Sequence, residues 1–318
     1  MKQDTTLLVE VARAYYEANY TQQEIAQTLG LSRSQVSRYL SEARARGIVQ
    51  IRIVDPEERA NEIESALKRR FPALVDAVVV PVFSDLPDVI LKAIGRACAE
   101  YLRDQITPGQ RLCIGCGRTL RETINWMKPN GVDDLTVIQA MGALGHEAAL
   151  NIDYNELARA AGEALGARVY YLNAPAVLGA GTAAELVAAN PTIAQALRLA
   201  RNADLYVVGL GSPAGDHLYV ETGTVSAEDL AMVERCGAVG DICGRFFDIH
   251  GNVCPSPFEA RVVGIELEDL RRARLSLAVA GGADKVRPLL GALRGGYINA
   301  VVTDRYTASQ VLALAGDA

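Results

Sequence analysis

Short β-branched runs alternate with helical stretches over most of the chain, and this alternation limits the folds that the chain can adopt. The pattern starts with an apolar run at 78–80 before a helical stretch at 89–102, and it ends with 300–302 before 308–314. Strands that alternate with helices favour parallel pairing, with the helices packed on the two faces of the sheet. The sequence therefore predicts a doubly wound, mostly parallel α/β domain. Further strands are expected at 112–114, 135–138, 169–172, 205–208 and 277–280, and further helices at 120–127, 155–165, 182–189, 227–235 and 285–293.

The N-terminal part differs from this pattern, because residues 20–40 read as a helix-turn-helix. Thr21 and Glu24 have the spacing of a capping box at the start of one helix. Gly30 follows the apolar face of that helix, where a left-handed backbone turns the chain. Ser32 stands where it caps a second helix, whose apolar residues at i, i+3 and i+4 pack back onto the first.

The second helix of such a motif enters the major groove of DNA. Arg and Gln side chains match the edges of guanine and adenine. Residues 32–52 hold five arginines and one acid, although the whole chain has a net charge of −6, so a local basic face is expected on an acidic protein. The alternative is an αα-hairpin that only packs, and the agreement of caps, turn and polar face disfavours it. The predicted DNA-binding residues are Thr21, Ser32, Arg33, Ser34, Gln35, Ser37 and Arg38.

The length of 318 residues exceeds one ordinary domain, so two domains are expected. Residues 1–55 form the predicted DNA-binding domain, in which a first helix at 7–19 braces the motif and a strand at 48–54 belongs to a wing. Residues 56–318 form the predicted effector domain, which begins with a helix at 57–70. No apolar run reaches membrane-spanning length and no signal-peptide pattern is present, so a cytoplasmic protein without a membrane partner is expected.

Glycine-rich loops follow several of the predicted strands. Ligands of doubly wound sheets bind outside the carboxyl ends of the strands. The loop 115–119, Gly-Cys-Gly-Arg-Thr, leads into a helix, and its backbone N–H groups are suited to an anion. A second glycine loop is at 209–213, and a third at 281–285 ends in Lys285, whose charge is unfavourable in the first turn of a helix unless an anion is near. A tight turn without a ligand, and a merely exposed lysine, are the alternatives.

Metal, redox and catalytic sites have little support in the sequence. Cys113 and Cys116 form a single C-x-x-C pair and the three histidines show no ligand spacing, so no metal or cofactor is predicted. In a cytoplasmic chain the six cysteines are expected as buried thiols. An isomerase or deaminase would need a positioned base, for which Asp241, Asp248 and His250 are the nearby candidates. None lies in a catalytic motif, so no catalytic residue is predicted.

Taken in order along the chain, these stretches resemble the SorC family of bacterial transcriptional regulators. The matching residues are 31–38, 115–119, 173–176, 204–212, 237–242, 247–248, 281–282, Lys285 and 295–299. The resemblance implies a C-terminal domain similar to sugar-phosphate isomerases and glucosamine-phosphate deaminases, which binds a phosphorylated sugar, and a homo-oligomer, either dimer or tetramer. By position, the resemblance assigns the phosphate to Gly115, Gly117, Arg118 and Thr119, and the rest of the pocket to Gly209, Gly211, Asp241, Arg261 and Lys285.

The sequence thus predicts a transcriptional regulator of a carbohydrate-utilisation operon that binds operator double-stranded DNA and is gated by a phosphorylated sugar. One alternative is an enzyme fused to a DNA-binding module. Another is a regulator that senses an unphosphorylated polyol, in which case Thr119 and Lys285 would matter little. The identity of the sugar, the operator sequence and the direction of regulation are left open.

Overall fold

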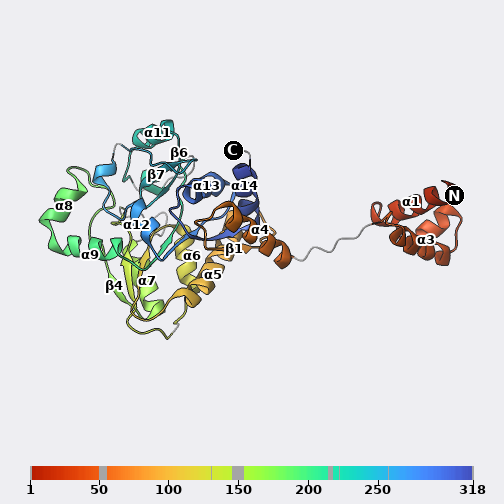
Figure 1. Cartoon of the computed structure of the whole chain (residues 1–318), viewed down its shortest axis with the longest axis horizontal. Coiled ribbons are helices and arrows are strands. Elements are labelled where there is room, and N and C mark those ends of the chain that lie inside the picture. The colour runs from red at the N-terminus through yellow and green to blue at the C-terminus, as the bar shows by residue number, and fades with distance from the viewer. Residues whose placement is uncertain are drawn as a thin grey trace. The chain divides into compact units, whose positions relative to one another are not determined.

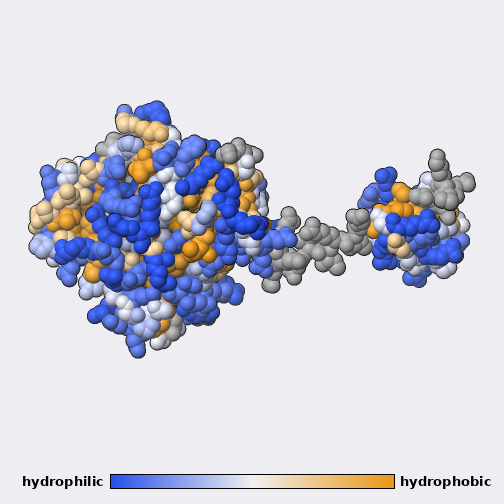
Figure 2. All heavy atoms as spheres, in the orientation of Figure 1, coloured by the Kyte–Doolittle hydropathy of each residue, from blue (hydrophilic) through white to orange (hydrophobic). Residues whose placement is uncertain are grey.

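The computed structural model describes residues 2–49, 56–129, 131–144, 154–213, 218–221, 223–256 and 258–316. The chain forms two compact units, Met1–Asp55 (unit 1) and Pro56–Ala318 (unit 2) (Figure 1). Within the described ranges, no helix is long and apolar enough to cross a bilayer. Hydrophilic side chains cover most of the visible surface of each unit (Figure 2), because the large apolar side chains are mostly buried.

Unit 1 contains α1 (Lys2–Tyr16), α2 (Gln22–Leu29) and α3 (Arg33–Ala45). The apolar residues of α2 and α3 recur at helical spacing, so one face of each helix is directed at α1. A small core forms between the three helices and excludes water from their contact surfaces. Its buried members include Val11, Ile25, Ala26, Val36 and Leu40.

Two predictions for unit 1 differ from the structure or lie outside it. The first helix spans Lys2–Tyr16 and not 7–19, and Asn19 after it has a φ of 57°, a left-handed conformation that does not continue a helix. Residues 50–54 of the predicted wing strand lie outside the described residues. Residues 48 and 49 form a bend after α3.

Unit 2 is built on a parallel sheet that, within the described residues, has seven strands in the order β1-β9-β8-β5-β2-β3-β4. The central strands β3, β5, β8 and β9 are buried along their whole length, and β2 is buried apart from its first residue. Such continuous apolar runs are typical of sheets covered on both faces. The strands are β1 (Asp76–Val80), β2 (Arg111–Ile114), β3 (Thr136–Gln139), β4 (Arg168–Tyr170), β5 (Leu205–Val208), β8 (Leu275–Val279) and β9 (Ala300–Asp304).

The strand order explains how the helices are distributed over the sheet. The chain first runs from β1 through β2 and β3 to β4, and it then returns through β5 and β8 to β9. Crossovers between parallel strands are right-handed, so helices of crossovers toward β4 and helices of crossovers back toward β9 lie on opposite faces of the sheet. The helices are α4 (Pro56–Arg70), α5 (Pro87–Gln105), α6 (Arg118–Trp126), α7 (Tyr154–Leu165), α8 (Ala183–Ala189), α9 (Pro191–Arg201), α10 (Leu218–Glu221), α11 (Ala227–Arg235), α12 (Leu267–Arg272), α13 (Val286–Arg294) and α14 (Arg305–Gly316), with 3-10 turns η1 (Glu259–Arg261) and η2 (Ala283–Lys285).

Besides the short helices α10 and α12 and the two 3-10 turns, two elements of unit 2 have no counterpart in the predicted pattern. One is α9, which fills the stretch before β5 and starts with Pro191 at its first position. The other is an antiparallel hairpin of β6 (Ala238–Ile242) and β7 (Arg245–Asp248). Its two-residue turn has φ of 50° at Cys243 and 78° at Gly244. Positive φ at both positions is the requirement of a tight hairpin turn.

The cysteines are all free thiols. Four of them are buried, Cys116 is half-buried, and Cys236 at the end of α11 is exposed. The expectation of buried thiols therefore holds for most of them, and Cys236 departs from it.

Candidate DNA-binding and effector sites

The starts of α2 and α3 are held by hydrogen bonds that the sequence pattern anticipates. Thr21 accepts a hydrogen bond from the Glu24 N–H at 3.3 Å, and the Thr21 N–H donates to Glu24 Oε2 at 2.8 Å. Gly30 has a φ of 65° and closes α2. Ser32 then caps α3 by accepting from the Gln35 N–H at 3.2 Å. These contacts fix the angle at which the second helix leaves the first.

The side chains of Thr21, Ser32, Ser34 and Gln35 make local hydrogen bonds at the helix starts, although they were predicted to meet DNA. Arg33, Ser34, Ser37 and Arg38 are exposed on α3, whereas Gln35 is half-buried. The side-chain oxygen of Gln35 accepts from the Ser32 N–H at 2.8 Å, which completes a second capping box. Gln35 therefore contributes to the helix start as well as to the face of α3, and only its amide NH₂ is left to approach a base.

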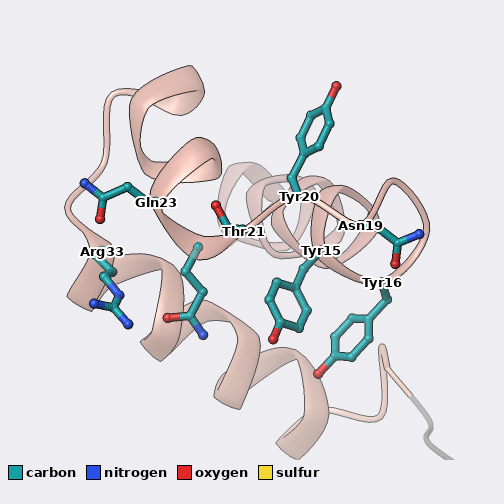
Figure 3. Close-up of a pocket in the computed structure, with 8 residues that line it drawn as sticks. Tyr15, Tyr16, Asn19, Tyr20, Thr21, Gln23 and Arg33 are labelled. Carbon is teal, nitrogen blue, oxygen red and sulfur yellow. The ribbon is translucent and has the colours of Figure 1, made fainter.

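An open hollow of about 760 Å³ lies between the end of α1, the start of α2 and the start of α3. The side chains of Tyr15 and Tyr16 point to the same side as that of Arg33, and Tyr20 points the other way (Figure 3). The lining is polar apart from the tyrosine rings. It consists of Tyr15, Tyr16, Asn19, Tyr20, Thr21, Gln22, Gln23 and Arg33.

In unit 2, β2 and β5 are neighbours although they are separated in sequence. This is the point where the chain reverses its running direction across the sheet, and ligands of such sheets bind there. The Gly115 N–H donates to Val207 O at 2.8 Å. A Cβ on Gly209 would lie 3.4 Å from Cys116 O. The loops after the two strands are thus in direct contact.

The loop after β2 leads straight into α6. Gly117 has a φ of 116° and stands before the first helical residue, Arg118, and no side chain caps this helix start. The N-cap residue of α6 therefore offers no side-chain acceptor to the first N–H groups of the helix. Arg118 is exposed and Thr119 is half-buried. Within the described parts of the chain, Arg118 has no ion pair, so its guanidinium is available to a ligand.

Asp241 on β6 is only 3% exposed and packs against the loop after β5. Its Oδ2 accepts hydrogen bonds from the Tyr219 hydroxyl and from the Gly244 N–H, each at 3.0 Å. Burial raises the pKa of Tyr219, and the Asp241 carboxylate raises it further, so the hydroxyl stays protonated and donates. A Cβ on Gly211 would lie 1.8 Å from Asp241 Oδ1, which explains the glycine.

Lys285 lies at the end of η2, after β8, the other neighbour of β5. Its side chain is 23% exposed, and its Nζ lies 2.8 Å from Asp284 Oδ2. Asp284 is largely exposed, so this ion pair is weak and a bound anion can compete for the ammonium group. The loops after β2 and β5 thus bring Gly115 and Gly209 close together, and Gly211 lies against Asp241 on β6. Lys285 follows the neighbouring strand β8.

Arg261 lies beside Val262, which packs against Gly244 in the turn of the β6–β7 hairpin. Arg261 ends η1, and its guanidinium donates to Leu178 O at 3.2 Å. The Leu178 N–H in turn donates to Arg261 O at 3.0 Å. These bonds hold Arg261 to the segment that follows β4, and not to the loop after β2.

The groups considered for metal or catalytic chemistry have other roles in the structure. Burial raises the pKa of Cys116 to about 12 and also raises that of Cys113, so both thiols are protonated at neutral pH. Among the described residues, no group of three or more His, Cys, Asp or Glu side chains is placed to hold a metal ion. Asp248 closes a turn by accepting from the His250 and Asn252 N–H groups at 2.9 and 2.8 Å. Burial raises the pKa of Asp248, but these hydrogen bonds outweigh it and lower the pKa overall.

Several buried polar residues near the site were missed by the sequence analysis. Tyr219 contacts Asp241, and the Tyr154 hydroxyl lies beside the Cys116 thiol. Asp304 and Thr307 join the end of β9 to the loop after β8. Thr303-Asp304 reads as a helix cap in the sequence, but its reach to a loop 22 residues away has no local signal.

The comparisons with known proteins fit this division into two units. A family model described as a sugar-binding domain matches residues 55–313, and a Crp-like helix-turn-helix model matches residues 5–58. The deoxyribonucleoside regulator of Bacillus subtilis is 34% identical over 304 residues, which cover 95% of this chain and 96% of the relative. The sorbitol operon regulator of Klebsiella pneumoniae is 30% identical over 323 residues, which cover 97% and 98%.

The solved structures agree. The crystal structure of the full-length sorbitol operon regulator SorC from Klebsiella pneumoniae superposes with a TM-score of 0.71 at 29% identity, covering 97% of this chain and 99% of that one. Fold and matches together define a transcriptional regulator with an N-terminal helix-turn-helix and a C-terminal sugar-binding domain. The chain belongs to the SorC family of such regulators. The predicted family and α/β fold class are thereby confirmed.

Proposed function

We propose that the protein regulates a carbohydrate-utilisation operon in response to a phosphorylated sugar that binds at the carboxyl ends of β2, β5 and β8. The DNA-binding unit contacts operator DNA through α3, with Arg33 and Arg38 as the charged contacts. It acts in the cytoplasm as a homo-oligomer, with the effector domain altering the affinity for the operator.

One observation carries the proposal of a phosphorylated effector. The first turn of α6 begins after Gly117 without a side-chain cap, directly beside the loop after β5. Free N–H groups and the helix dipole favour an anion there. Lys285 lies after β8, on the far side of β5, and adds a positive charge on the same edge of the sheet. A phosphate matches both features, whereas a neutral polyol carries no charge that competes with Asp284 for the Lys285 ammonium group.

The names of the relatives suggest which compounds to test first. One relative is a deoxyribonucleoside regulator and another regulates a sorbitol operon. Deoxyribose phosphate and sorbitol phosphate are therefore the first two probes, and deoxyribose, deoxyribonucleosides and sorbitol are the matched compounds without a sugar phosphate. A wider panel of pentose and hexose phosphates follows if neither binds.

Calorimetric titration of the full-length protein with these probes tests the proposal. Phosphorylated probes should bind more tightly than the free sugars, and Lys285→Ala should weaken their binding by about tenfold to a hundredfold, because a charged hydrogen bond contributes roughly 1.5–3 kcal/mol. Thr119→Ala should also weaken it. Equal affinity for the phosphorylated and free sugar, or wild-type affinity in both variants, would contradict the phosphate site.

A further inference from the structure

A buried carboxylate stands where β9 meets α14. Asp304 is 2% exposed and Thr307, three residues on, is fully buried. The two carboxylate oxygens have different partners. Oδ1 accepts from the Thr307 N–H at 3.0 Å, which is the hydrogen bond of a helix N-cap. Oδ2 accepts from the Thr307 hydroxyl at 2.6 Å and from the Gly282 N–H at 2.8 Å.

The hydrogen bond from the Gly282 N–H to Oδ2 is not part of a helix cap, because Gly282 belongs to the loop after β8. The Gly282 N–H also lies 2.8 Å from the Thr307 hydroxyl oxygen, so both side chains hold the same backbone group. A buried charge is costly unless it is fully hydrogen-bonded. Here the carboxylate is compensated by donors from α14 and from the loop, so the two segments are joined at this point.

The loop has little freedom to take another path. A Cβ on Gly281 would lie 2.7 Å from Asp304 Oδ2 and 2.9 Å from Ile90 Cγ2, so the backbone is packed between the carboxylate and α5. The Lys285 N–H donates to Gly282 O at 3.0 Å. The position of Lys285 therefore follows from that of Gly282.

We propose that Asp304 and Thr307 are positioning residues of the effector site. They fix the loop 281–285 and thereby the Lys285 ammonium group at the end of β8, where it meets the phosphate of the effector. Neither side chain touches the effector itself. This inference rests on the proposed function, because it assigns a role to residues behind the same site.

Two substitutions separate this role from helix capping. Asp304→Asn keeps an oxygen that can cap α14, but its NH₂ group cannot accept from the Gly282 N–H. Thr307→Val keeps the shape of the side chain and the charge of Asp304, but removes the hydroxyl. Thr307→Ser restores that hydroxyl. Thr182→Ala is the matched control, since Thr182 caps α8 by accepting from the Glu185 N–H at 3.2 Å and has no contact with the loop 281–285 among those found in the described residues.

Titration of the full-length variants with inorganic phosphate, deoxyribose phosphate and sorbitol phosphate provides the test, with thermal unfolding of each variant recorded in the absence of ligand. Asp304→Asn and Thr307→Val should each weaken binding of the phosphorylated probes by about tenfold, because a displaced Lys285 ammonium group loses much of one charged hydrogen bond to the phosphate. Thr307→Ser and Thr182→Ala should bind them like the wild type.

The outcomes distinguish this inference from the proposed function. If Lys285→Ala loses affinity while Asp304→Asn and Thr307→Val bind like the wild type, the pair serves the fold alone and the inference is wrong, although the phosphate site stands. If the wild type binds none of the phosphorylated probes, both proposals fail. Should Asp304→Asn not fold, the comparison of Thr307→Val with Thr307→Ser decides, and equal weakening in these two would overturn the role of the hydroxyl.

Discussion

Arg33 and Arg38 lie on the same helix but in different surroundings, so they are expected to contribute differently to DNA binding. Arg33 lines the hollow beside the start of α2, where a DNA phosphate would meet both the guanidinium and the free N–H groups of the helix. Arg38 projects from the exposed face of α3 and stacks over the Tyr39 ring at 5.5 Å. We therefore expect Arg33 to contact the DNA backbone and Arg38 to contact base edges.

We expect Arg33→Ala to weaken binding to operator and to random DNA by a similar factor, and to reduce the slope of log affinity against log salt by about 1. Arg38→Ala should cost about 1–3 kcal/mol on the operator and less on random DNA. Fluorescence anisotropy with both DNAs over a range of salt concentrations measures this. Arg44→Ala is the control, because it removes the same charge from the last turn of α3. An equal loss for Arg44→Ala would show that net charge alone is responsible.

The residues of the helix-turn-helix also show how much can be predicted from sequence at this scale. Thr21, Gly30 and Ser32 were identified correctly, because caps and left-handed turns depend on the residue and its immediate neighbours. The engagement of Gln35 in the capping box was missed, since the same side chain suits both a cap and an adenine. Contacts between distant segments, such as Asp304 with Gly282, leave no local signal at all.

At the scale of elements, Gly211 and Gly209 offer a direct comparison within one loop. A Cβ on Gly211 would lie 1.8 Å from Asp241 Oδ1, and that carboxylate is held by Tyr219 and Gly244. Gly211→Ala should therefore displace the β6–β7 hairpin from the loop and destabilise unit 2 by about 1–3 kcal/mol, the usual effect of overpacking. A Cβ on Gly209 would lie no closer than 3.4 Å to its neighbours. Gly209→Ala should change stability by less than about 1 kcal/mol.

Urea unfolding followed by the fluorescence of Trp126 measures this difference. It is the single tryptophan of the chain and lies at the end of α6, so its signal reports on unit 2 and not on unit 1. Equal unfolding midpoints for the two alanine variants would contradict this prediction. They would mean that Asp241 and the hairpin move away from the added Cβ without lowering the free energy of unfolding.

The elements that were predicted and those that were missed differ in a physical way. The strands of the parallel sheet were found because burial on both faces produces runs such as 205–208, which stand out from the helical stretches around them. The hairpin of β6 and β7 was missed because its turn uses Cys243 and Gly244 in place of the usual Asn-Gly. For α9 a signal existed, since Pro191 at the first helical position is a common helix start.

At the scale of the whole molecule, the effector loops could be located from the sequence only as a set of strand ends. Which ends adjoin is decided by strand order, and β5 lies between β2 and β8 although the chain visits β3 and β4 first. This order depends on crossover handedness and on packing over long separations in sequence. The assignment of Arg261 to the pocket stays a prediction, since its guanidinium donates to Leu178 O.

The whole molecule should act on DNA as an oligomer. Unit 1 presents a single recognition helix, α3, with about two turns of exposed polar side chains, and one such helix reads only a half-site. Full-length protein should therefore bind an operator with two half-sites, spaced by about one helical turn or a multiple of it, far more tightly than DNA with a single half-site. Sedimentation velocity on the protein with and without each DNA measures both the stoichiometry and the oligomeric state. A monomer that binds DNA with one half-site as tightly as the full operator would contradict the oligomer, and would mean that contacts outside α3 provide the affinity.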